Sequence, residues 1–280
     1  MTSPLPDPAT AAVLGVRFHS FTRLQAATEI ARLARSGRRS YVVKPYSEFL
    51  PRAASDDGIR SILNGAALCL PDGMGIVWAA YYLSLPGGRV RALLQLPLSL
   101  GGMALRPSSI RQPLREAMAG VDLTWQMLAE LERGGASVFL LGGTQREVSA
   151  ACRVIARRLP GLKLAGSHHG HFTRTGAGNE AVIATINEAA PDVLLVAMGF
   201  PRQERWIAAN LELLSVRLTV AEGGSFSFIS GSTRRAPQWM RRAGLEWLFR
   251  LLRQPSRLRR QLALPVFVWL VARERLRRAG

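Results

Sequence analysis

Short apolar runs alternate along the chain with segments in which apolar residues recur every three or four positions. The short runs are rich in Val and Leu, which is typical of buried strands, and the spaced pattern is typical of amphipathic helices. We expect strands at 40–44, 66–70, 137–141, 162–165, 192–197 and 217–221. We expect helices at 53–63, 75–85, 122–133, 178–190 and 203–214, and one that follows 142–144 and ends near Arg158.

Turns that contain glycine follow most of these strands. They lie at 71–75, 142–144, 168–172, 199–204 and 222–224. A repeated order of strand, turn and helix predicts an α/β fold, a Rossmann-like and mostly parallel sheet with helices on both faces. Ligands of such sheets bind beyond the carboxyl ends of the strands. We therefore expect these turns to meet at one edge and form the site.

Two stretches do not fit this pattern. Residues 86–120 contain Gly and Pro, include the apolar run 92–105, and are expected to be irregular. The apolar run 262–272 has arginines on both sides. Neither run reaches the roughly 20 residues that a membrane-spanning helix needs. Apolar centres with arginine edges are typical of segments that lie on a membrane surface.

Composition narrows the class of protein. The chain has 280 residues, of which 48% are hydrophobic and 20% charged, and this excludes a disordered chain or a coiled coil. Cys69 and Cys152 cannot build a disulfide framework, and residues 1–10 lack the pattern of a secretory signal. We expect a reduced, cytoplasmic compartment.

The excess positive charge is concentrated at one end of the chain. The net charge is +18, and residues 234–280 hold 13 Arg against two acids. Such a segment attracts a polyanion, which can be nucleic acid, an anionic bilayer or phosphates. A solvated arginine face is the alternative. We divide the chain into a core at 1–233, with an insertion at about 86–115, and a basic C-terminal appendage at 234–280.

Asp72 and Gly73 follow an expected apolar strand. A carboxylate at this edge can act as general base toward a sugar hydroxyl, and the glycine allows close approach of a ligand. The alternative is that Asp72 only caps the helix expected at 75–85.

Further along, Gly142 and Gly143 open a helix, whose free N–H groups suit a diphosphate. No GxGxxG or Walker sequence is present, so a tight turn without a ligand is an equal alternative. Gly199 and Gly223 lie in the following turns, and Gln203 lies in the first turn of a helix, with its amide expected to face the same edge. A plain helix entry is the alternative for Gln203.

His168, His169 and His171 form a local cluster. Metal sites need converging ligands, usually with Cys or acidic partners, and none has a suitable spacing here. The sequence therefore predicts no metal site and no cofactor. A turn that contacts substrate, or a plain loop, is favoured.

Arginines recur at spacings of three and four near the end of the chain, at 250, 253, 257 and 260. Guanidinium groups bind phosphate with two parallel hydrogen bonds, so these arginines can hold a diphosphate or rest on anionic head groups. Aromatic residues lie between them, as interfacial segments often show, although core packing explains the aromatics equally well.

Five ordered blocks over about residues 40–262 resemble the WecG/TagA/CpsF glycosyltransferases of the N-acetylmannosaminyltransferase type. The blocks are LPDGMGIVWAA at 70–80, VFLLGG at 138–143, PGLKLAGSHHGHF at 160–172, PDVLLVAMGFPRQERWI at 191–207 and GGSFSFISGSTRRAPQWMRRAGLEWLFRLLRQPSRLRRQ at 223–261.

The resemblance implies an inverting, metal-independent transfer of a sugar from a UDP-sugar to a polyprenyl-diphosphate-linked glycan acceptor, in cell-surface polysaccharide synthesis. It implies a peripheral protein on the cytoplasmic face of the cell membrane, whose basic appendage attaches to the anionic membrane surface and closes over the site. Asp72 corresponds to the proposed base and Gln203 to the Gln of the family's PxQE motif. Arg250, Arg257 and Arg260 correspond to the arginines that engage the diphosphate.

Two departures from the family pattern bear on specificity. Where the family has a Thr-Pro-Asn-Ala-Glu turn near the donor sugar, this chain has Lys44-Pro45-Tyr46-Ser47-Glu48. Lys44 and Tyr46 are bulkier, and the lysine adds a charge, so UDP-glucose or another UDP-hexose is an alternative donor, for exopolysaccharide synthesis. The segment 86–115 also exceeds the family's short link, which suggests an additional membrane or acceptor contact.

Two other classes of protein remain as alternatives. A basic nucleic-acid-binding or membrane-binding module without catalysis would leave the acidic and Gly-rich turns unused, and no RNP-type or helix-turn-helix signature is present. A nicotinamide oxidoreductase is disfavoured because its glycine fingerprint is absent. We expect no nucleic-acid partner, and a homo-oligomer stays open.

Overall fold

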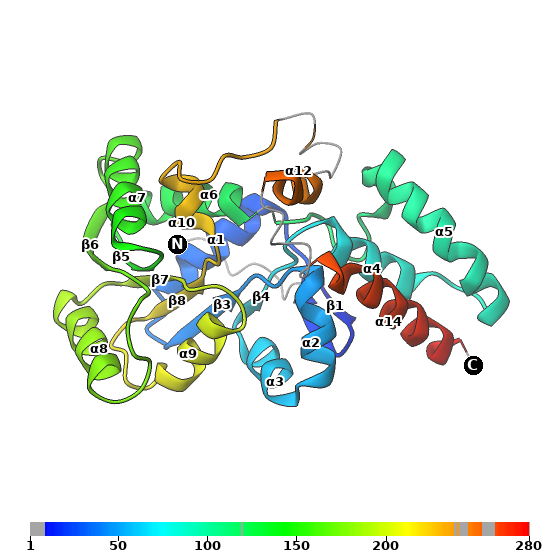
Figure 1. The fold of residues 1–280 in the computed structure, drawn as a ribbon, viewed down its shortest axis with the longest axis horizontal. Helices are drawn as coiled ribbons and strands as arrows, with labels where there is room; N and C mark the ends of the chain where they lie inside the picture. The colour runs from blue at the N-terminus through cyan, green and yellow to red at the C-terminus, as the bar shows by residue number, and fades with distance from the viewer. Residues whose placement is uncertain (1–8, 119, 238–239, 241–245, 254–260, 280) are drawn as a thin grey trace.

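The structure is a computed structural model and describes residues 9–118, 120–237, 240, 246–253 and 261–279. Its centre is a six-stranded sheet in the order β4-β3-β8-β7-β5-β6, in which every pair is parallel (Figure 1). The strands are β3 (Ser40–Val43), β4 (Leu68–Cys69), β5 (Ser137–Gly142), β6 (Lys163–His168), β7 (Val193–Ala197) and β8 (Leu218–Ala221).

Helices cover both faces of this sheet. On one face lie α1 (Arg23–Ala34), α6 (Gly120–Arg133), α7 (Gln145–Arg158) and α10 (Ser225–Ile229), and on the other lie α3 (Asp57–Gly65), α8 (Ala177–Ala189) and α9 (Arg202–Asn210). Side chains of a strand alternate between the faces. In β5, Val138 and Leu140 join one buried cluster, and Phe139 and Leu141 join the other. The predicted α/β fold with helices on both faces is confirmed.

The other helical elements follow β3 or β4 in sequence or belong to the C-terminal part of the chain. They are α2 (Leu50–Ser55), α4 (Met74–Ser84), α5 (Arg89–Leu105), α12 (Glu246–Arg253), α14 (Ala263–Arg278), and the 3-10 turns η1 (Ser47–Phe49) and η2 (Pro107–Ile110). Between residues 238 and 260, the structure describes residue 240 and α12. In Figure 1, α5 and α14 lie side by side at one end of the molecule, and they contact each other.

The expectation of irregular structure at 86–120 is wrong, because α5 runs through Pro97. Proline removes one backbone hydrogen bond from a helix. Side chains of α4 nevertheless hold α5 in place. Trp78 Nε1 donates to Ser99 Oγ over 3.0 Å, and the Tyr82 hydroxyl donates to the Ala92 carbonyl over 2.9 Å. Tertiary contacts thus override the local preference.

The N-terminal part holds elements that sequence analysis missed. Strands β1 (Thr10–Val13) and β2 (Val16–His19) form an antiparallel hairpin. Its turn has positive φ at Leu14 (50°) and Gly15 (77°). Helix α1 then begins with a capping box, in which the Thr22 side chain accepts from Gln25 N and the Gln25 side chain accepts from Thr22 N. The expected helix at 53–63 is also divided, because Asp56 caps α3 by accepting from Ile59 N over 3.0 Å.

Helix α14 is docked on the rest of the molecule. Phe267 is buried, and its ring edge lies 3.8 Å from where a Cβ on Gly75, at the start of α4, would sit. Glu274 Oε2 accepts from Leu14 N over 2.9 Å, and buried Arg275 donates to the carbonyls of Leu85 and Gly87. None of the helices among the described residues has both the length and the apolarity to cross a membrane.

We expect Phe267→Ala to lower the free energy of unfolding by about 3–5 kcal/mol, because it empties a fully buried aromatic site. Trp269→Ala is the matched control in the same helix, since Trp269 is 57% exposed, and we expect it to change stability by less than about 1 kcal/mol. Urea unfolding followed by circular dichroism measures both. Equal losses in the two variants would contradict the docking of α14.

Candidate functional site

The carboxyl ends of the central strands bring most of the predicted site residues to one edge of the sheet. Tyr46 and Asp72 form a backbone bridge that prolongs the pairing of β3 and β4, and Asp72 N donates to the Pro45 carbonyl over 3.2 Å. The Phe49 and Phe200 rings stack at 4.1 Å, which joins the turns after β3 and β7. The turns at 71–75 and 199–204, which were expected to meet at one edge, therefore both lie beside the turn after β3.

Asp72 lies in the turn between β4 and α4 and is 5% exposed. The N-cap position of α4 is occupied by Gly73, so Asp72 is not its capping residue. Gly120, the first residue of α6, faces the carboxylate, because a Cβ placed on it would lie 3.1 Å from Asp72 Oδ2 and 3.6 Å from the Tyr46 hydroxyl. Sequence analysis missed Gly120, since nothing local distinguishes it from an ordinary glycine before a helix.

Gln203 fastens two of the turns to each other. Its Oε1 accepts from Gly199 N over 3.1 Å and from Gly223 N over 3.0 Å. Its Nε2 donates to Glu204 Oε1 over 2.8 Å. The amide predicted to face a ligand therefore already makes three hydrogen bonds, and it holds the ends of β7 and β8 in register.

Glu204 is almost fully buried beside Gln203. Burial raises the pKa of Glu204 from its ordinary value of 4.5 to about 7, although the hydrogen bond from Gln203 opposes this shift. The second carboxyl oxygen, Oε2, is buried without a hydrogen-bond partner among the described residues. The carboxyl group thus titrates near neutral pH.

Lys44 lies at the end of β3 in a buried ion pair. Its Nζ is 2.8 Å from Glu222 Oε1. The other oxygen, Glu222 Oε2, accepts from Thr124 Oγ1 of α6 over 2.5 Å. The charge that Lys44 brings to the edge is therefore offset by Glu222, which sequence analysis had noted only as part of a turn.

Three of the predicted glycines border open space. Gly73, Gly199 and Gly223 have φ of +95°, +77° and +59°. Among the described residues, no atom lies within 4 Å of a Cβ placed on any of them, apart from their chain neighbours. Such positions favour glycine and leave room for a ligand to approach the backbone.

Gly142 and Gly143 differ from these three. A Cβ on Gly142 would lie 2.3 Å from the Ala197 carbonyl oxygen, and Gly143 N donates to the same oxygen over 3.1 Å. In the next residue, Thr144 N donates to Glu147 Oε2 over 2.9 Å in a capping box. Close packing therefore accounts for this turn, and its role in diphosphate binding stays a prediction.

The histidine cluster is held by contacts within its own turn. His168 Nδ1 lies 2.7 Å from the His169 carbonyl, and His171 N lies 3.2 Å from His169 Nδ1. Across the described part of the chain, no group of three or more His, Cys, Asp or Glu side chains is placed to hold a metal ion.

The predicted diphosphate arginines are placed only in part. Arg250 lies in α12, but its side chain and the whole of Arg257 and Arg260 are outside the described residues. At the start of the basic C-terminal appendage, Arg235 Nη1 lies 2.5 Å from Asp122 Oδ1, and Arg235 Nη2 lies 3.1 Å from Asp122 Oδ2. Asp122 forms this two-point ion pair from the first turn of α6.

Comparisons with known proteins identify the chain as a glycosyltransferase. It belongs to the WecG/TagA/CpsF glycosyl transferase family, whose sequence model matches residues 11–100 and 96–280. Among its relatives are the N-acetylglucosaminyldiphosphoundecaprenol N-acetyl-beta-D-mannosaminyltransferases of Staphylococcus aureus strains MW2 and COL. Each is 27% identical over 263 residues, which cover 93% of this chain and 91% of the relative.

We expect Lys44→Met to lower the free energy of unfolding by about 3–5 kcal/mol, because Glu222 would keep a buried charge without its partner. The double variant Lys44→Met/Glu222→Gln leaves no buried charge at this position and is expected to regain most of the loss. Urea unfolding at neutral pH measures the three proteins. If the double variant is as unstable as the single one, the pairing does not determine the stability of the edge.

We expect Glu204→Gln to change how stability depends on pH. Between pH 4.5 and about 7 the folded protein keeps a proton on Glu204 that the unfolded chain releases, so the free energy of unfolding falls as pH rises through this window. The loss is about 3 kcal/mol in total.

Urea unfolding of both proteins at pH 4.5 and pH 8 measures this loss, since the glutamine lacks the titration. Relative to the variant, the wild type should become less stable at the higher pH. Glu212→Gln, at an exposed site, is the control and should keep the wild-type profile. If the stability of Glu204→Gln depends on pH as that of the wild type does, Glu204 is not the group that titrates in this window.

Proposed function

We propose that this glycosyltransferase moves a sugar of the N-acetylmannosamine type from a UDP-sugar to a polyprenyl-diphosphate-linked glycan, in the synthesis of a cell-surface polysaccharide. Family membership over most of the chain supports the reaction class. The names of the relatives, which act on N-acetylglucosaminyldiphosphoundecaprenol, support the acceptor and the transferred sugar.

Asp72 is the proposed general base, and its position is the observation that carries the proposal. It is a buried carboxylate at the edge of the sheet formed by the carboxyl ends of the strands. It lies next to Gly73, whose backbone a ligand has room to approach. A general base must lie within hydrogen-bond reach of the hydroxyl from which it takes the proton. Tyr46 and Gly120 are its close neighbours in the structure.

The chemistry is a single displacement with inversion. Asp72 takes the proton of the acceptor hydroxyl, the oxygen forms a bond to the anomeric carbon, and the bond from that carbon to the UDP oxygen breaks. The leaving diphosphate gains negative charge, and we assign its stabilisation to Arg250, Arg257 and Arg260 without a metal ion. Fixed positive charges in a closed site act strongly because water is excluded.

Gln203 acts in this proposal mainly by positioning. Because its amide binds Gly199 N and Gly223 N, it fixes two turns whose open glycines line the proposed donor site, with Gly142 and Gly143 nearby. The acceptor carries a polyprenyl anchor, so we place the reaction at an anionic membrane surface, on its cytoplasmic face.

Lys44 and Tyr46 replace smaller residues of the family pattern, and this favours an alternative candidate for the donor. UDP-glucose or another UDP-hexose would lack the acetamido group and leave room for them. The buried pair of Lys44 with Glu222 supports a site in which the lysine does not contact the sugar, and this keeps N-acetylmannosamine as the first choice.

The test is a panel of UDP-sugars offered with a short-chain prenyl diphosphate that carries N-acetylglucosamine, with products identified by mass. We expect transfer from UDP-N-acetylmannosamine. We expect Asp72→Asn to bind the donor as the wild type does and to lower turnover at least about 100-fold, which is the range for loss of a general base.

The control is Asp57→Asn, which neutralises an exposed carboxylate on α3 and should keep full turnover. If transfer occurs only from another UDP-hexose, that sugar replaces N-acetylmannosamine as the proposed donor. No transfer from any UDP-sugar would reject the proposed function, and normal turnover of Asp72→Asn would reject the base.

A further inference from the structure

Helix α5 presents an apolar face to solvent. Val90, Leu93, Leu94, Leu98 and Leu105 are between 56% and 85% exposed. Residues 90, 94, 98 and 105 are separated by four, four and seven positions, which places them along one side of a helix. We call these five side chains the α5 apolar face.

The inward side of α5 is occupied by its own contacts, since Leu96, Leu100 and Met103 pack against the buried core. Ser99 is buried and accepts from Trp78 Nε1, and buried Ala92 offers its carbonyl to Tyr82. A helix on the surface of a soluble domain normally buries its apolar side chains and exposes its polar ones. An exposed contiguous apolar face marks a surface that binds something.

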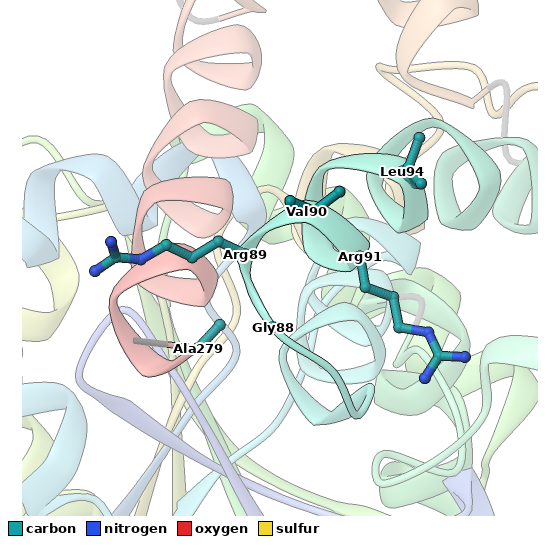
Figure 2. Close-up of a pocket in the computed structure, with 6 residues that line it drawn as sticks. All are labelled: Gly88, Arg89, Val90, Arg91, Leu94 and Ala279. Atoms are coloured by element: carbon teal, nitrogen blue, oxygen red, sulfur yellow. The ribbon is translucent and has the colours of Figure 1, made fainter.

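Arginines border this face. Figure 2 shows Arg89 and Arg91 extending to opposite sides of the start of α5, while Val90 and Leu94 project from the helix between them. The long stretch from residue 73 to 115 holds five arginines and no acidic residue. Apolar side chains flanked by arginines fit the boundary between lipid head groups and acyl chains.

We propose that the α5 apolar face inserts into the surface of an anionic phospholipid bilayer, with Arg89 and Arg91 on its head groups. Charge decides between this occupant and a second copy of the chain. Two copies meeting through this face would bring two acid-free, arginine-rich stretches together, whereas anionic lipids oppose that charge.

The neighbouring helix also has exposed apolar side chains. α14 packs beside α5, and its outward positions include Leu262, Val266 and Trp269, followed by Arg273. The Arg273 guanidinium lies 5.3 Å from the centroid of the Trp269 ring. α14 therefore adds exposed apolar side chains and an arginine at the end of the molecule where α5 lies.

The test is sedimentation of the full chain with vesicles, compared between phosphatidylcholine alone and its mixture with phosphatidylglycerol. We expect Leu94→Gln/Leu98→Gln to weaken binding to the mixed vesicles at least about tenfold, since two large apolar side chains no longer enter the bilayer. We expect Arg89→Gln/Arg91→Gln to weaken it about tenfold on mixed vesicles and little on phosphatidylcholine.

The matched control is Leu24→Gln/Leu213→Gln, which changes two leucines of similar exposure outside α5 and should bind as the wild type does. Thermal unfolding confirms that all variants are folded. Wild-type vesicle binding by Leu94→Gln/Leu98→Gln would overturn the proposal. The proposal would also be overturned if the wild type is a dimer, Leu94→Gln/Leu98→Gln is a monomer and vesicle binding is unchanged. That outcome would assign the face to self-association. No sugar donor is present, so the result is independent of the proposed glycosyl transfer.

Discussion

The buried contact between Lys44 and Glu222 holds the centre of the site edge together. Lys44 directly follows β3, Glu222 directly follows β8, and Thr124 of α6 donates to the second carboxyl oxygen. Glu222 N also donates to the Val196 carbonyl over 2.7 Å, which brings in β7. A charge buried in a protein is tolerated only with partners of this kind. Three strand ends and one helix are thereby fixed beside each other, and Asp72 lies in the turn that adjoins this arrangement.

Gln203 and Glu204 form a second fixed point on the same edge. Gln203 joins the Gly199 and Gly223 turns through their backbone N–H groups, and Glu204 orients the amide that does so. The two residues are adjacent in sequence but have different environments. The Gln203 amide makes three hydrogen bonds, whereas Glu204 keeps a buried oxygen without a partner among the described residues. Backbone geometry around open glycines is thus set by side chains that do not themselves line the open space.

The strands of the central sheet and the turns after them could be predicted from sequence, because short apolar runs and glycine turns are local signals. The position of Asp72 at the edge followed from the same reasoning. Partners distant in sequence could not be predicted, as with Lys44 and Glu222, which are 178 residues apart, or Gly120 beside Asp72. Helix α5 was missed because Pro97 and two glycines favour a loop locally, whereas contacts from α4 decide its conformation. Roles assigned to Arg257 and Arg260 rest on the resemblance alone.

The ion pair of Arg235 with Asp122 has a consequence for the arginine-rich segment that follows it. Asp122 is two residues from Gly120, which faces Asp72, and Phe267 lies against Gly75, three residues after Asp72 in sequence. Arg235 and Phe267 are thus fixed positions before and after the arginine-rich stretch, so the entropy of holding these two positions is lost when the protein folds and not when a substrate arrives.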